Sequence, residues 1–251
     1  FGLLIVGDIG AFRTGDADAA IKLLAIEHLA GTVGFDDDDG VVPQPFIRRE
    51  AIAALQAFAA ATLGYSLYYV CRTSLNVVKK PILESGALDA TQLGVIGSAL
   101  LFAYAIGKFV NGFLSDHSNI KRFMATGLIV SAAANALMGL LGLAHSVVPT
   151  AVIFVTFAVM WGINGWAQSM GAPPAIISLS RWYPLRERGT YYGFFSASHN
   201  LGEFFSFLFV GSIVTFAGWQ AGFFGSAVAG AIGVVLVLCW LHDTPESKGL
   251  P

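Results

Sequence analysis

Residues 92–115 read QLGVIGSALLFAYAIGKFVNGFLS, a long apolar stretch in which Lys108 is the one charged side chain. A bilayer's hydrocarbon core of about 30 Å needs roughly 20 apolar residues as an α-helix. A helix also pairs its own backbone N–H and C=O groups, which lipid cannot do for it. The stretch therefore predicts a membrane-spanning helix. The whole chain agrees, because 55% of its 251 residues are hydrophobic and only 12% are charged, against about 25% charged in soluble proteins.

Similar apolar segments lie on both sides of this stretch, and together they predict an all-α membrane protein. Its core is a six-helix transmembrane bundle in residues 47–243. The region before it, residues 1–46, is polar and is expected to be a cytoplasmic segment, while residues 244–251 are expected to begin a cytoplasmic loop. The six predicted spans lie near residues 53–78, 92–115, 122–143, 149–176, 190–215 and 220–241.

Lysine and arginine are unevenly shared between the two sets of connections. One set carries eight of them, and the other carries only Lys79 and Lys80. Cytoplasmic loops carry an excess of Lys and Arg, so we predict a multi-pass protein of the inner (plasma) membrane with both termini in the cytoplasm. The net charge of −2 and the lack of a basic patch argue against a nucleic-acid partner. The eight residues are Arg48, Arg49, Lys121, Arg122, Arg181, Arg186, Arg188 and Lys248.

Four ionisable residues fall well inside the predicted spans. Charged groups at the bilayer centre cost at least about 2.5–3.5 kcal/mol, so they usually face a protein interior or a water-filled pathway. Polar neighbours at spacings of three and four residues share a helix face with them, which predicts one common wet cavity. The four are Arg72, Lys108, His199 and Glu203; the polar neighbours are Tyr65, Tyr69, Asn76, Tyr104, Trp161, Asn164 and Gln168.

Two of these residues are cations and one is a carboxylate, which leaves positive charge unneutralised. An anion is the natural partner, because arginine offers a planar fork that matches phosphate or carboxylate and lysine adds a point charge. A set of structural salt bridges, for example Glu203 with Arg72, is the alternative. No nucleophile–base pair or cluster of metal ligands is recognisable, so we predict no enzyme, catalytic residue, metal or cofactor.

Several motifs resemble the organophosphate:phosphate antiporter family of the major facilitator superfamily, which includes glycerol-3-phosphate, hexose-phosphate and phosphoglycerate transporters. The similarity extends from Leu63 to Pro251. It implies the N-terminal half of a twelve-helix fold that has its substrate between two six-helix halves. The motifs are GYSLYYVCRTSLNVV (64–78), LFAYAIGKFVNGFLSDHSNIKRFMATGLI (101–129), RWYPLRERGTYYGFFSASHNLGE (181–203) and DTPESKGLP (243–251).

The resemblance also implies a function and residue roles. The expected activity is exchange of an organophosphate for inorganic phosphate by alternating access, with a C-terminal six-helix half as partner. A membrane sensor of sugar phosphate that signals to a histidine kinase, or a non-functional half-transporter, are the alternatives. Glu203 and Asp116 are expected to act in coupling or gating, and Asn76, Asn164 and Gln168 to line the cavity. The residues expected to bind substrate are Arg72, Lys108, Tyr65, Tyr69, Tyr104 and His199.

Overall fold

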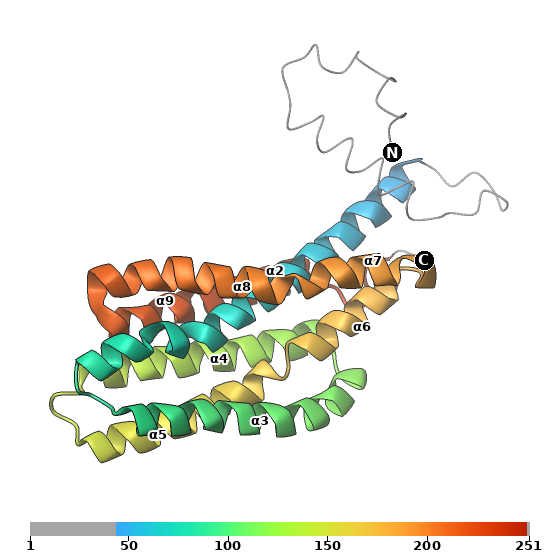
Figure 1. Cartoon of the computed structure of the whole chain (residues 1–251). Helices are drawn as coiled ribbons and strands as arrows, with labels where there is room; N and C mark the ends of the chain where they lie inside the picture. The colour runs from blue at the N-terminus through green and yellow to red at the C-terminus, as the bar shows by residue number, and fades with distance from the viewer. Residues whose placement is uncertain (1–43, 250–251) are drawn as a thin grey trace, which may run out of the picture. The chain divides into compact units, whose positions relative to one another are not determined.

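The computed structural model describes residues 44–249, and every regular element in that range is helical, which confirms the all-α fold class. Residues 1–43 and 250–251 lie outside the described residues, and with them most of the predicted cytoplasmic segment 1–46. The helices, shown in Figure 1, are α2 (Gln44–Glu84), α3 (Ala90–Asp116), α4 (Ile120–Leu143), α5 (Thr150–Gln168), α6 (Ala172–Trp182), α7 (Leu185–Ser196), α8 (Ser198–Phe205), the π-helix η2 (Ser206–Val210), α9 (Gly211–Trp240) and the short 3₁₀ helix η3 (Pro245–Lys248).

Five helical segments in the described part are long and apolar enough to cross a membrane, where the sequence predicted six. The difference lies in the last segment, Leu185–Trp240, which is 56 residues long. Gly218 interrupts it with φ of +84°, a left-handed backbone conformation that glycine adopts at no steric cost. Figure 1 shows the chain turning back on itself within α9, so this one segment contains two antiparallel helical stretches, which correspond to two of the six predicted spans.

The α2 helix ends later than the sequence predicted. The predicted span stopped at residue 78 and left Lys79 and Lys80 in a connection, whereas α2 continues to Glu84 with Pro81 inside it. A capping box then starts α3: the Asp89 side chain accepts from the Gln92 N–H at 2.8 Å, and the Gln92 side chain accepts from the Asp89 N–H at 3.0 Å. The two lysines are therefore helical residues.

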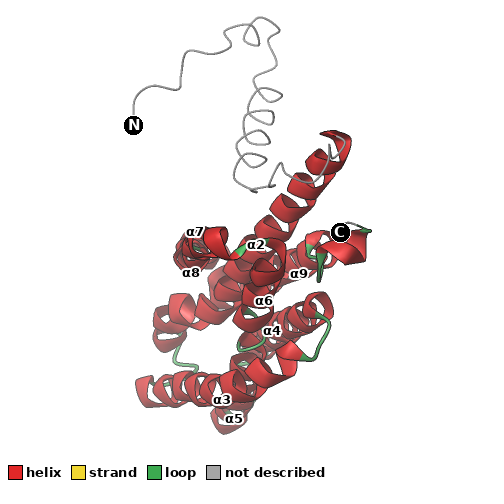
Figure 2. Ribbon diagram, turned by 90° about the vertical axis from the view of Figure 1, so that its right-hand side faces the viewer, coloured by secondary structure: helices red, strands yellow, loops and turns green. Residues whose placement is uncertain are grey.

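Glycines allow close packing between helices in the unit formed by residues 56–251. In Figure 2, α3 and α5 lie side by side; a Cβ placed on Gly165 of α5 would overlap the backbone of Leu100 in α3. A Cβ on Gly230 of α9 would lie 2.9 Å from the Cβ of Ala132 in α4. Small residues at such crossings are the usual means by which membrane helices approach each other.

Candidate substrate-binding site

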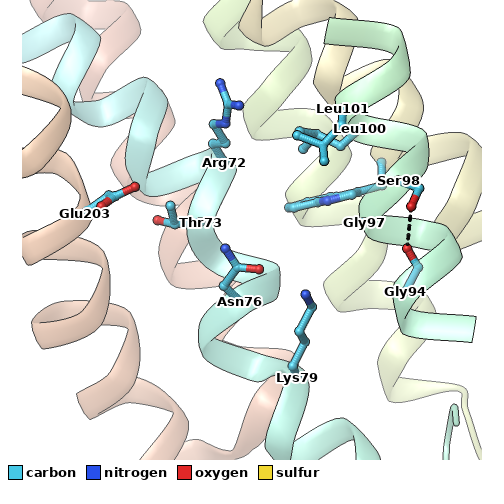
Figure 3. A pocket seen from close by; sticks show the side chains of 11 residues that line it. Arg72, Thr73, Asn76, Lys79, Gly94, Gly97, Ser98, Leu100, Leu101 and Glu203 are labelled. Carbon is cyan, nitrogen blue, oxygen red and sulfur yellow. Dashed lines mark hydrogen bonds between the residues drawn. The ribbon is translucent and has the colours of Figure 1, made fainter. Parts of the chain in front are cut away.

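A cavity of about 420 Å³ opens beside the middle of α2. Its walls come from α2, α3, α5 and α8, and Figure 3 shows charged and polar side chains of α2 and α8 pointing into it. It therefore combines ionisable groups with an aromatic and aliphatic wall, the composition expected of a small-molecule site. The lining residues are Arg72, Thr73, Asn76, Lys79, Gly94, Gly97, Ser98, Leu100, Leu101, Trp161 and Glu203.

Of the six residues expected to bind substrate, Arg72 alone belongs to the lining of this cavity, and the other five connect to it through one continuous set of contacts. The guanidinium carbon of Arg72 lies 4.2 Å from the centre of the Tyr104 ring and 5.6 Å from that of Tyr69. The Nζ atom of Lys108 also contacts the Tyr104 ring, 5.2 Å from its centre. Tyr69 in turn contacts Tyr65 and His199, with ring centres 5.3 Å and 5.7 Å apart. The structure thus brings residues of α2, α3 and α8 into contact, while their role in binding stays a prediction.

Arg72 has no carboxylate within ion-pair distance among the described residues. Glu203 lines the same cavity but is exposed, and the described ion pairs are Lys80 with Glu84 at 3.7 Å and Arg186 with Glu187 at 4.0 Å. The salt bridge between Glu203 and Arg72 that the sequence left open is therefore absent from this structure. The positive charge of Arg72 remains available to an anion.

Gly202 and Ser66 bring His199 and Glu203 to α2. The Ser66 Oγ donates to the Ser198 carbonyl at 2.9 Å, and a Cβ on Gly202 would lie 2.5 Å from the Cβ of Tyr69. Only a residue without a side chain fits between these helices at that distance. The close crossing is what places the polar face of α8 at the cavity.

The three residues expected to line the cavity separate into two groups. Asn76 is exposed and lines it, but Asn164 and Gln168 are buried and do not belong to its lining. Asn164 donates to the Cys71 carbonyl at 3.3 Å, and Gln168 donates to the Ser131 Oγ at 3.0 Å. Their side chains hold α2, α4 and α5 together, as buried polar groups in a bundle commonly do.

Asp116, expected to act in gating, is exposed as the last residue of α3 and forms no ion pair with any described residue. A carboxylate at a helix C-terminus interacts unfavourably with the helix dipole. The contacts of Asp116 do not test the expected gating role, which stays a prediction.

Lys79 also lines the cavity, although the sequence predicted it to lie in a connection. The available signal was its spacing: Lys79 lies seven residues after Arg72 and three after Asn76, on the same helical face.

The helical fold agrees with the comparison to known proteins. The profile of the Major Facilitator Superfamily matches residues 61–251. The chain belongs to this superfamily, and its apolar helices make it an integral membrane protein.

The similar proteins with printed names include transport proteins for phosphorylated compounds and a membrane sensor protein. The chain is 37% identical over 198 residues to the probable hexose phosphate transport protein of Chlamydia pneumoniae, 35% identical over 190 residues to the membrane sensor protein UhpC of Salmonella typhimurium, and 34% identical over 201 residues to the phosphoglycerate transporter protein of the same species. These matches cover 78%, 75% and 78% of this chain. The chain spans only about 41%, 40% and 41% of those relatives' lengths.

Solved structures show the same fold. A bacterial homologue of the human lysosomal transporter Spinster, in an inward-facing and unoccupied conformation, superposes with a TM-score of 0.57 at 19% identity, over 78% of this chain and 43% of that one. Its inward-facing, occupied form gives the same TM-score over 82% of this chain and 48% of that one.

Proposed function

We propose that the cavity binds the phosphate group of an organophosphate, and that the protein carries this compound across the membrane in exchange for inorganic phosphate by alternating access. The observation that carries the proposal is Arg72, a deep cation without a carboxylate partner among the described residues, held between tyrosine rings at a cavity. The names of the relatives support the substrate class, since they include transporters of hexose phosphate and phosphoglycerate.

The chemistry of the site suits a phosphate dianion better than a neutral solute. Arg72 can offer two parallel N–H donors to two phosphate oxygens, and Lys108 shares the Tyr104 ring with it. Tyr65, Tyr69 and His199 add groups that can donate hydrogen bonds to the remaining oxygens. The two positive charges of Arg72 and Lys108, placed inside the membrane-spanning segments, are stabilised when an anion binds between them, and this stabilisation contributes to the binding energy of the substrate.

Transport requires the cavity to open to each side of the membrane in turn. We propose that a second six-helix half closes the cavity opposite α2, and that the two halves rock about the bound anion, as the resemblance to two-halved transporters implies. Substrate and inorganic phosphate would then drive the exchange through their different affinities for the two facings.

The test is Arg72→Lys in the natural protein that carries this chain, reconstituted in proteoliposomes loaded with phosphate. The substitution keeps the charge but loses the bidentate fork, so we expect exchange of radiolabelled phosphate to fall at least a hundredfold. Arg181→Lys, which alters an exposed arginine outside the cavity, is the matched control. Exchange within a few-fold of the parent for Arg72→Lys would exclude this arginine as the phosphate ligand.

A sensor is the second candidate, because the chain is nearly as similar to a membrane sensor protein as to a transport protein. Both would bind a phosphorylated ligand, so a binding measurement does not separate them. Uptake does: a transporter accumulates labelled organophosphate in phosphate-loaded vesicles, and a sensor binds it at the same concentration without accumulating it.

A further inference from the structure

Lys79 is a second cation in the same cavity, and the proposed phosphate site does not use it. It follows Arg72 and Asn76 on one face of α2, and all three line the cavity. At 1.5 Å of rise per residue, the backbones of Arg72 and Lys79 lie about 10 Å apart along the helix axis. The Nζ of Lys79 lies 3.9 Å from the position that a Cβ on Gly97 would occupy, so the ammonium group extends across the cavity to α3. Figure 3 shows it directed into the cavity below Asn76.

The neighbouring lysine shows what an ordinary position on this helix looks like. The Lys80 side chain is 85% exposed and pairs with Glu84 at 3.7 Å. Lys79 is half-buried and has no ion-pair partner among the described residues. A role in neutralising the helix dipole does not explain it, because that effect is confined to the last turn, and the last turn of α2 holds no basic residue.

Positive groups therefore stand at two ends of one cavity, with neutral polar side chains between them. Thr73, Asn76 and Ser98 lie along this interval; the hydroxyls of Thr73 and Ser98 donate to backbone carbonyls at 2.8 Å and 3.0 Å, which leaves their oxygens as acceptors. Glu203 is the one carboxylate in the described lining, so the two cations exceed it by one charge. Such a cavity suits a ligand with an anion at each end and hydroxyl groups between.

We propose that Lys79 binds a second anionic group of the substrate while Arg72 holds its phosphate, so that the cavity selects organophosphates that also carry a carboxylate or a second phosphate. This inference rests on the proposed function and names its substrate class. Both side chains extend from α2 toward its N-terminal end, the direction in which helical side chains tilt, as Figure 3 shows, so the two charged ends lie about as far apart as the two backbones, about 10 Å. A phosphorylated carboxylate of about three carbons, with a charge-assisted hydrogen bond of about 2.8 Å at each end, spans that separation.

The experiment compares two ligands that differ only at the end facing Lys79. 3-Phosphoglycerate carries a carboxylate where glycerol 3-phosphate carries a CH₂OH group. Each is used to inhibit binding of radiolabelled inorganic phosphate to the natural protein in detergent. We expect 3-phosphoglycerate to inhibit at a concentration at least tenfold lower, the effect of about one charge-assisted hydrogen bond. In Lys79→Gln this ratio falls to within threefold, and phosphate binding and inhibition by glycerol 3-phosphate weaken together by no more than several-fold, because the cavity loses one positive charge.

Lys80→Gln is the matched control, since it removes the adjacent charge outside the cavity, and it keeps the ratio of the parent protein. Phosphate binding that persists in Lys79→Gln shows that the variant is folded. A ratio that survives Lys79→Gln, or a parent protein that does not distinguish the two ligands, overturns the role of Lys79 and leaves the proposed phosphate site standing. A parent protein that binds neither phosphate nor either ligand overturns the proposed function itself.

Discussion

Arg72 and Tyr104 face each other across the α2–α3 interface, with the guanidinium carbon 4.2 Å from the ring centre. The same ring lies 5.2 Å from the Nζ of Lys108. A cation near an aromatic face gains about 0.5–2 kcal/mol, more when water is excluded. One tyrosine ring therefore contacts two like charges, and its attraction for both offsets part of their mutual repulsion. This arrangement orients both cations before an anion binds.

Replacing Tyr104 separates the role of its ring from that of its hydroxyl. We expect Tyr104→Leu to weaken phosphate binding roughly five- to thirtyfold, because a cation–π contact of about 1–2 kcal/mol is lost. Tyr104→Phe keeps the ring and is expected to stay within threefold of the parent. Binding of radiolabelled phosphate to purified protein measures both. Equal losses in the two variants would mean that the hydroxyl, and not the ring, supports the site.

Glu203 is expected to compete with the substrate for the cations of the cavity. It lines the cavity with Arg72 and Lys79 without a salt bridge among the described residues, so its charge acts across the open space. Glu203→Gln raises the charge of the lining by one, and we expect phosphate to bind several-fold more tightly and to exchange more slowly, because release becomes harder. The gain should shrink at high salt, since added ions screen charges that face water. Binding and counterflow exchange on the same preparation test this, and unchanged or weaker binding by a folded variant would contradict it.

Helical periodicity and the cost of buried charge were enough to predict which side chains gather around Arg72. Arg72 and Lys108 are exceptional in apolar segments, and spacings of three and four residues identify which tyrosines share their faces. That reasoning found the contacts from Tyr65 through Tyr104 before any packing was known. It depends only on the residues of each helix.

Periodicity did not show what covers each helical face. Asn164 and Gln168 lie on a regular polar stripe, yet α2 and α4 pack over that stripe and use it for buried hydrogen bonds. The turn at Gly218 depends on a single backbone conformation. Counting continuous helical segments in the described part therefore gives five spans, where the lengths of the apolar stretches predicted six. The predicted span ends at residue 78 and leaves Lys79 in a connection, although α2 continues to Glu84 with Pro81 inside it. Each of these misjudgements concerns tertiary packing or a local backbone choice that the pattern does not encode.

The charge asymmetry predicts that the end of α2 faces outward and the C-terminal segment faces the cytoplasm. Cysteine labelling in intact cells tests this in a Cys239→Ser background, which removes the exposed native thiol and keeps the buried Cys71. We expect Ser85→Cys, in the exposed connection after α2, to react with a membrane-impermeant maleimide in intact cells. Ser247→Cys, exposed near the other end, should react only after permeabilisation. The reverse pattern would invert the predicted orientation.

Two glycines of the fifth membrane segment should respond in opposite directions to the same change. A Cβ on Gly202 would overlap the Ser66 carbonyl oxygen and lie 2.5 Å from the Cβ of Tyr69. Neither the backbone nor a Cβ can move aside without moving α2 itself, so Gly202→Ala should cost about 1–3 kcal/mol of stability. Gly193 has no atom within 4 Å of an added Cβ, and Gly193→Ala should gain up to about 1 kcal/mol from the higher helix propensity of alanine.

Thermal unfolding in detergent compares these two variants directly. We expect the melting temperature to fall for Gly202→Ala and to stay level or rise for Gly193→Ala. Phosphate binding should weaken in the first variant alone, because the displaced Tyr69 contacts both His199 and Arg72. Should both substitutions raise the melting temperature, α8 would not lie against α2 as closely as the structure has it. His199 and Glu203 would then lose the crossing that places them at the cavity, and the argument for an anion held between α2 and α8 would fail with it.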